Sequence, residues 1–165
     1  NQRRVLREVM EKYDIDGVEA NALTGPWWMT VSGCVAGHVE PEVPNLKETY
    51  YDDYADYLVT VIEHFREQWG VTFQTISPFA EASQDFWKMG GNQEGCFHTN
   101  EQANRLVKLL GRKLEERGLP TTVSAPDEWS VGESIEVYQS FDDKAKSVVS
   151  AISAHSYWEI GRAHV

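Results

Sequence analysis

The sequence lacks several features that mark whole classes of protein. Its only cysteines are Cys34 and Cys96, which form no CxxC pair and have no histidine at zinc-finger spacing. No apolar run reaches the roughly 18 residues of a membrane-spanning helix. No GxGxxG, P-loop or GxSxG segment occurs, so nothing marks a dinucleotide site, a nucleoside triphosphate site or a serine-hydrolase elbow.

Positive charge is also scarce. Lysine and arginine number 15 against 26 aspartates and glutamates, which gives a formal net charge of −11. Nucleic acids and anionic membranes need a basic surface, so we expect neither as a partner. The 165 residues are 41% apolar and include six tryptophans, enough to build the core of one domain of ordinary size.

What the sequence does contain is an alternation of helical and strand patterns. Helices are expected at residues 2–13, 49–69, 99–118, 130–140 and 141–150, with a break near Phe141; strands are expected at 18–22, 73–76, 121–125 and 151–154. Such alternation indicates an α/β fold with a parallel sheet and helical crossovers. Either a (β/α)8 barrel or a doubly wound sheet would place the loops after the strands at one edge.

Those loops hold the residues with chemical potential. Glu81 follows the second strand, in the stretch of residues 73–96 that also holds a glycine pair. One edge of the sheet would then gather Trp28, Glu81, Trp87, Asp127, Glu128, Trp129, His155, Tyr157 and Trp158. Carboxylates with flat aromatic rings suit glycoside hydrolysis. Alternatively, Glu81 caps a helix or pairs with a surface cation, and the Trp27–Trp28 pair packs in the core instead of stacking on sugar.

Histidine spacing gives no support to a metal site. His38, His64, His98 and His155 show no i, i+4 pairing on a helix. The acidic residues of 49–69 lie mostly off its apolar stripe and indicate a solvated face. We therefore predict no metal and no cofactor.

Seven separate segments, in order, resemble glycoside hydrolase family 30, especially its endo-β-1,6-galactanase-like branch. They are residues 26–33 (PWWMTVSG), 45–47 (NLK), 54–58 (YADYL), 76–79 (ISPF), 91–96 (GNQEGC), 124–128 (SAPDE) and 155–157 (HSY). The resemblance implies a partial (β/α)8 barrel of about four β/α units, with the C-terminal part of the barrel missing. It implies a secreted retaining glycosidase, monomeric in its complete form, acting on β-linked galactan.

The resemblance also implies roles for residues. Glu81 falls on the family's acid/base, at the end of the fourth barrel strand. The nucleophile follows the seventh strand and is absent here, so the 165-residue chain alone is expected to be inactive. Sugar subsites would be shaped by Trp28, Trp87, Asp127, His155 and Tyr157.

The family's Asn-Glu-Pro motif is Ala80-Glu81-Ala82 in this chain. Alanine cannot make the hydrogen bond to the sugar 2-hydroxyl that strengthens in the transition state, and it gives up the fixed φ of proline. A non-catalytic carbohydrate-binding relative of the same barrel therefore stands as an alternative to the hydrolase.

The ends and the cysteines complete the sequence-based expectations. Residues 1–158 would form the partial catalytic barrel. Residues 159–165 do not continue the preceding pattern and resemble the translation of a sequencing adapter; an ordinary polar C-terminus is the alternative. Cys34 and Cys96 lie in loops after neighbouring strands, where a disulfide is a candidate in a secreted protein and two free thiols are equally expected.

Overall fold

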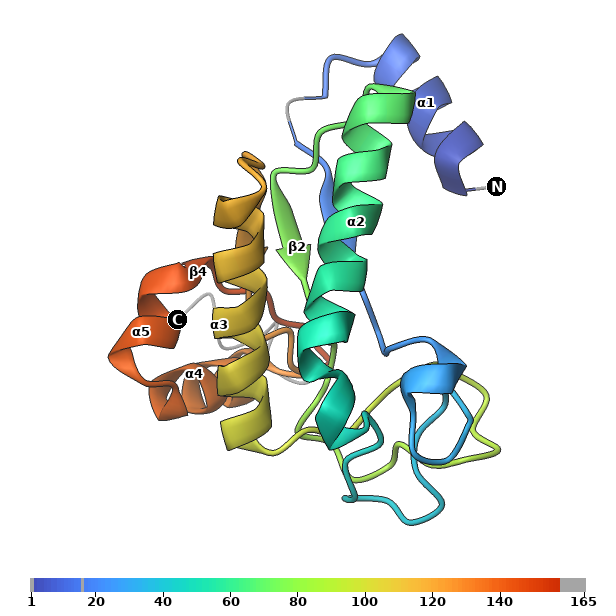
Figure 1. The fold of residues 1–165 in the computed structure, drawn as a ribbon, viewed down its shortest axis with the longest axis vertical. Helices are drawn as coiled ribbons and strands as arrows, with labels where there is room; N and C mark the ends of the chain where they lie inside the picture. Colours follow the sequence, from blue (N-terminus) through green and yellow to red (C-terminus); the bar gives the residue numbers. More distant parts are fainter. Residues whose placement is uncertain (1, 16, 158–165) are drawn as a thin grey trace.

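The computed structural model of the protein describes residues 2–15 and 17–157 and shows one parallel sheet (Figure 1). The strands are β1 (Glu19–Asn21), β2 (Thr75–Ser77), β3 (Thr122–Ser124) and β4 (Val149–Ala151). Their order in space, β1-β2-β3-β4, is their order in the chain, and every neighbouring pair is parallel. A doubly wound sheet reverses its strand order at a switch point, whereas a barrel keeps it. The topology therefore favours the barrel.

The sheet is also strongly curved. Ser153 Oγ, just after β4, donates to Glu19 Oε1 of β1 at 3.2 Å. In a flat sheet these edge strands would lie about 14 Å apart, three strand spacings. The Asn21 side chain likewise reaches Asp127, beyond β3, at 2.6 Å. The four strands thus wrap around a concave polar face, as the wall of a barrel does.

Helices cover the outer face of the sheet. They are α1 (Gln2–Lys12), α2 (Tyr51–Trp69), α3 (Asn100–Glu116), α4 (Val131–Ser140) and α5 (Asp143–Val148), with short 3₁₀ turns η1 (Trp27–Met29) and η2 (Glu48–Tyr50). In Figure 1, α2 and α3 lie side by side in front of the strands. Their buried stripes, Tyr54, Leu58 and Ile62 on α2 and Leu106 and Leu110 on α3, join the same apolar core as Ile76 and Val123 of the sheet.

The helix ends are closed by glycine and by side-chain caps. Gly70 ends α2 with φ 66°, a left-handed conformation that favours glycine. Thr99 caps α3 in a full capping box: its hydroxyl accepts from the Gln102 N–H, and the Gln102 side chain accepts from the Thr99 N–H. Ser130 and Asp142 cap α4 and α5 through their side-chain oxygens, and Phe141 separates these two helices.

The last strand lies earlier than predicted. β4 is Val149–Ala151, not residues 151–154, so two residues expected in a helix are in the sheet. A β-bulge between Val123 and Ser124 shifts the β3–β4 register at this point, and Ser150 Oγ donates to the Thr122 hydroxyl. Beyond Ala151 the chain pairs back through an isolated bridge from Ala154 to Glu128. Residues 152–154 therefore cross the carboxyl edge of the sheet.

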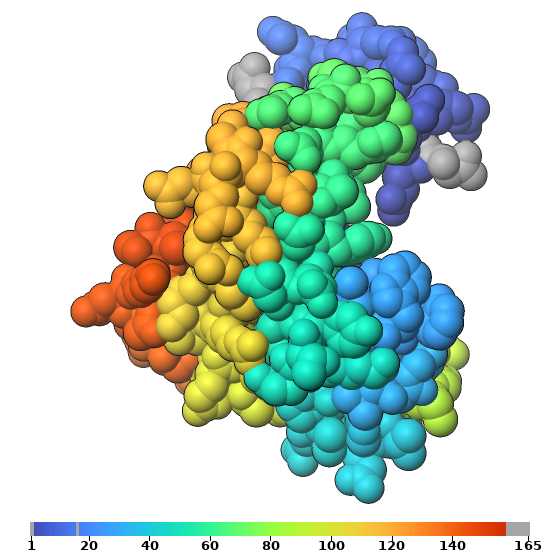
Figure 2. All heavy atoms as spheres, in the orientation of Figure 1, coloured from blue at the N-terminus to red at the C-terminus, as the bar shows by residue number. Residues whose placement is uncertain are grey.

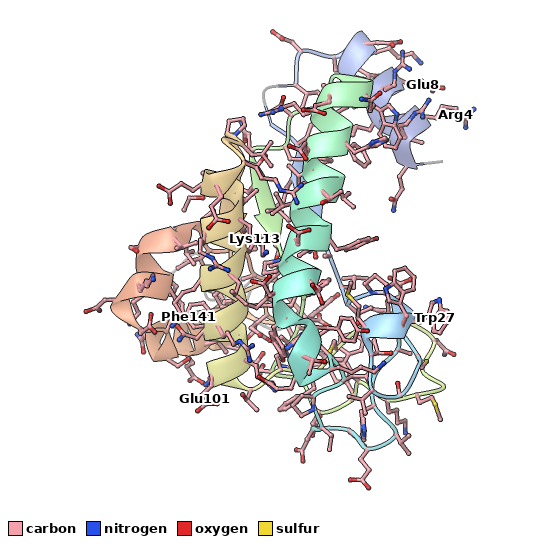
Figure 3. The ribbon with its side chains drawn as sticks, in the orientation of Figure 1. Arg4, Glu8, Trp27, Glu101, Lys113 and Phe141 are labelled. Carbon is pink, nitrogen blue, oxygen red and sulfur yellow. The ribbon has the colours of Figure 1, made fainter. Side chains whose placement is uncertain are left out.

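The acidic face of α2 is paired with cations at the C-terminal end of α3 and just after it. Lys113, seen between the two helices in Figure 3, lies 2.9 Å from Asp52 and 3.7 Å from Asp56. Arg117 binds Asp56 at 2.7 Å and Glu63 at 2.9 Å. No group of three or more potential metal ligands occurs among the described residues, and no helix among them is long and apolar enough to cross a membrane.

Beside β1 the surface is hollowed. A depression of about 630 Å³ runs between α1, β1 and α2, with apolar walls that include Leu6, Val18, Val61 and Phe65. It opens in Figure 2 between α1 and the loop after β1. β1 and β4 each have one strand neighbour among the described strands.

The capping box yields a stability prediction. Thr99→Ala leaves the Gln102 N–H without its partner and should lower the free energy of unfolding by about 1 kcal/mol. Thr99→Ser keeps the hydroxyl and is the matched control. Urea unfolding of the three proteins measures the difference; equal stability of the Ala and Ser variants would contradict the prediction.

Candidate active site

The candidate site lies where the four strands end. Parallel strands bring their carboxyl ends to one edge of a sheet, and each strand here sends a polar side chain to that edge. These are Asn21 from β1, Glu81 after β2, Asp127 after β3 and His155 after β4. In Figure 1 the loops after β1 and β2 gather at this same end, below the point of the β2 arrow.

Glu81 is held in an unusual backbone conformation. Its φ is 49°, in the left-handed region that non-glycine residues seldom adopt. The Glu81 N–H donates to the Asp127 carbonyl at 2.6 Å, and the Glu81 carbonyl accepts from the Trp87 indole N–H at 2.7 Å. Only 5% of the residue is exposed. Neighbouring loops thus fix the direction in which the carboxylate points.

Side-chain contacts link all four strand ends in one chain. Asn21 Nδ2 donates to Asp127 Oδ2 at 2.6 Å, and Asp127 Oδ1 lies 3.6 Å from His155 Nε2. The other ring nitrogen of His155, Nδ1, lies 2.5 Å from Glu81 Oε1. The structure therefore brings together three residues that the sequence analysis named, Glu81, Asp127 and His155, and adds Asn21.

Burial dominates the electrostatics of Asp127. Desolvation raises the pKa of its carboxyl above the ordinary value, while the Asn21 amide and the nearby His155 work in the opposite direction. Asn21 was not named as a candidate site residue. Its only sequence signal is its place near the end of the first predicted strand, residues 18–22.

Glu128 has a different position from its neighbour Asp127. It is fully buried, and its carboxylate accepts from the Ser83 hydroxyl at 2.8 Å and faces the Ser83 N–H at 3.3 Å. Burial raises the pKa of this carboxyl. The Glu128 carbonyl also accepts from the His155 N–H at 2.7 Å. Glu128 therefore ties the loops after β2, β3 and β4 together.

Trp87 is buried, whereas a ring that stacks on sugar must expose one face. The ring is only 5% exposed, and a Cβ on Gly95 would come within 2.1 Å of it. Gly37, at φ 131°, lets the loop after β1 approach the Trp87 backbone just as closely. Since its indole N–H holds the Glu81 carbonyl, Trp87 supports the acidic residue from behind instead of offering a face for stacking.

Other aromatic rings are open. Trp28 on η1 is 48% exposed and Tyr157 is 63% exposed. The Tyr157 ring stands edge-on to His155 at 5.3 Å and contacts Trp129 at 5.6 Å, and Phe86 extends this row at 5.8 Å from Trp129. Phe86 was missed because a single phenylalanine in a loop carries no pattern. Trp158 and the tail 159–165 lie outside the described residues.

Both cysteines are free thiols in the structure, so the candidate disulfide is not formed there. The two loops are neighbours as expected, since the Gly95 N–H donates to the Val35 carbonyl at 2.9 Å. Cys96 is fully buried, and burial raises the pKa of its thiol to about 11. It therefore behaves as a small core residue.

Comparison with known proteins identifies the family. The sequence pattern described as O-glycosyl hydrolase family 30 matches residues 14–162. The chain belongs to this family. It is 29% identical over 135 residues to an endo-β-1,6-galactanase of Hypocrea rufa, and 22% identical over 185 residues to an exo-β-1,6-galactobiohydrolase of Bifidobacterium longum. These alignments cover 82% and 87% of this chain but only 28% and 12% of the relatives.

Solved structures show the same fold. An endo-β1,6-glucanase superposes with a TM-score of 0.76 at 22% identity, and the catalytic domain of xylanase C from Talaromyces cellulolyticus with 0.76 at 19%. A conserved exported protein from Bacteroides fragilis gives 0.78 at 24%. The matches cover 92–95% of this chain and 34–36% of those chains. This family 30 chain is thus part of a (β/α)8 barrel, and the barrel prediction is confirmed.

The raised pKa of Glu128 yields a prediction about pH. The folded chain holds this proton more tightly than the unfolded chain, whose pKa is near the ordinary 4.5. Stability from Glu128 is therefore fully present below that pH and is lost as pH rises through the folded-state pKa. Glu128→Gln has no proton to lose, so its stability relative to wild type should rise as the pH increases above about 4.5.

Urea unfolding across this pH range measures the difference. Glu136→Gln on the exposed side of α4 controls for the loss of one surface charge. A stability difference between the Glu128→Gln variant and wild type that stays constant with pH would contradict the prediction.

Proposed function

We propose that these residues form the acid/base half of a retaining glycoside hydrolase that cleaves β-linked galactan, as an endo-β-1,6-galactanase does. The observation that carries the proposal is the placement of Glu81: a buried carboxylate at the carboxyl edge of a barrel sheet, aimed by two backbone hydrogen bonds and one imidazole. Family membership and the name of the Hypocrea rufa relative support the reaction and the polymer.

The reaction would run as a double displacement. Glu81 gives its proton to the glycosidic oxygen while a second carboxylate attacks the anomeric carbon, so the leaving alcohol departs and a glycosyl ester forms. Glu81, now ionised, takes a proton from water, and the resulting hydroxide cleaves the ester and restores both carboxyl groups. The second carboxylate would come from a later barrel strand, since Asp127 and Glu128 already bind Asn21 and Ser83.

The exposed rings suit a sugar polymer. Trp28 and Tyr157 are exposed rings that can stack on the apolar C–H face of a pyranose. His155 contacts both Tyr157 and Glu81, and Asp127 lies on the other side of the His155 ring. Trp87 would contribute by holding the Glu81 backbone through its indole N–H. Polymeric galactan does not cross a membrane, so we also propose that the protein is secreted and acts outside the cell. We propose that it acts as a monomer.

One observation favours a second candidate, a carbohydrate-binding protein without turnover. Ala80 and Ala82, on either side of Glu81, are both buried and apolar. Neither can donate a hydrogen bond to a sugar hydroxyl beside the acid. Hydrogen-bond donors of this kind are worth on the order of 3–4 kcal/mol in catalysis.

The hydrolase proposal is tested in the complete gene product that contains these residues. Glu81→Gln keeps the shape of the side chain but carries no transferable proton, so release of β-1,6-galacto-oligosaccharides should fall by about 10² to 10⁴-fold. Glu136→Gln, on the exposed side of α4, is the matched control and should keep the wild-type rate.

Ala80→Asn separates the two candidates. Under the hydrolase proposal the wild type already releases oligosaccharides and the variant is faster. A wild type that binds galactan without turnover, with or without activity in the Asn variant, would support the binding protein instead.

A further inference from the structure

We propose that His155 is a positioning residue that holds the acid/base Glu81 by one chosen oxygen, and that Asp127 holds His155 in turn. This inference rests on the proposed function. It goes beyond that function by assigning His155 a role toward Glu81 in place of a contact with sugar.

The imidazole is part-buried, with 30% of the side chain exposed, and groups on several sides orient it. Nδ1 faces Glu81 Oε1 at 2.5 Å and Nε2 faces Asp127 Oδ1 at 3.6 Å, so the ring lies between two carboxylates. Its backbone N–H is bound to the Glu128 carbonyl, and Tyr157 stands edge-on to the ring at an interplanar angle of 88°. A ring held on so many sides has little freedom to turn toward a substrate.

The contact decides which oxygen of Glu81 does the chemistry. Once Glu81 is ionised its carboxylate can only accept hydrogen bonds, so in that state Nδ1 donates to Oε1. Of the two carboxylate oxygens of Glu81, only Oε1 has a side-chain partner among the described residues. Oε2 is therefore left to carry the proton that is transferred. A donor on Oε1 also stabilises the carboxylate that remains after Glu81 has protonated the leaving group.

Asp127 acts on Glu81 by two routes. Its carboxylate, itself oriented by Asn21 at 2.6 Å, faces the far side of the His155 ring. Its carbonyl accepts the Glu81 N–H at 2.6 Å. The position of Glu81 is thereby tied to all four strand ends, so the register of the sheet sets the direction of the acid.

The test compares leaving groups in the complete gene product. Cleavage of a natural β-1,6-galacto-oligosaccharide needs a proton on the leaving oxygen, whereas an aryl galactoside with an acidic phenol does not. His155→Ala should therefore lower kcat/KM by about 10²-fold on the oligosaccharide and by less than about 3-fold on the aryl substrate. His155→Asn, whose amide can donate near the position of Nδ1, should recover part of the loss.

Two controls keep this comparison sharp. His64→Ala removes an exposed histidine on α2, far from the strand ends, and should leave both values unchanged. Equal losses on the two substrates in His155→Ala would overturn the proposal, because a ring that binds sugar or merely supports the fold affects both alike.

A second measurement needs no activity. With ¹⁵N-labelled histidine in the complete gene product, the His155 ring should show an exchange-protected Nδ1 proton, assigned by its loss in His155→Ala. Glu81→Ala should abolish this protection, and Glu136→Ala should not. Protection that survives Glu81→Ala would overturn the contact. If the complete protein hydrolyses no galactan, the proposed function fails, while this signal still decides whether Glu81 holds the ring.

Discussion

The site depends on the hydrogen bond from the Glu81 N–H to the Asp127 carbonyl. It joins the loops after two neighbouring strands, and it holds Glu81 at a positive φ that its side chain would otherwise disfavour. Trp87 secures the other side of the same residue through the Glu81 carbonyl. Because the backbone is fixed on both sides, the side chain starts from a fixed position, and its carboxylate contacts the His155 ring.

Placing so many carboxylates at one buried edge is costly, and the structure shows how the cost is reduced. Asp127 and Glu128 each receive donors, the amide of Asn21 and the hydroxyl and N–H of Ser83, and burial still raises both pKa values. Stability must come from elsewhere in the chain. The apolar stripes of α2 and α3, packed on the outer face of the sheet, supply it.

The fold could be predicted from the sequence much further than the site. Long helices repeat their pattern over many turns, so α2 and α3 could be predicted from the sequence. Strands of three residues are too short to show a period. The prediction placed β4 too late in the chain, because no local pattern encodes the bulge that shifts its register. Alternation alone also could not separate a barrel from a doubly wound sheet.

Within the site, residue types were predictable but their contacts were not. Glu81, Asp127 and His155 could be named because each follows a strand. That they form one chain with Asn21 depends on the curvature of the sheet, which is a property of the whole. Trp87 shows the same limit: an aromatic residue in a glycine-rich loop is equally suited to stacking on sugar or to supporting a loop. The close approach of Gly37 and Gly95 to Trp87 shows that this ring supports the loop.

Curvature also connects the fold to the chemistry. A flat sheet would leave Glu19 and Ser153 on opposite edges, yet they are hydrogen-bonded across the concave face. The same bend brings the end of β1 to the end of β3 and the end of β4 to Glu81. Any change that flattened the sheet would separate Asn21 from Asp127 before it exposed the apolar core, because the polar contacts span strands that are not neighbours. The orientation of Glu81 is therefore more sensitive to the shape of the barrel wall than the stability of the helices is.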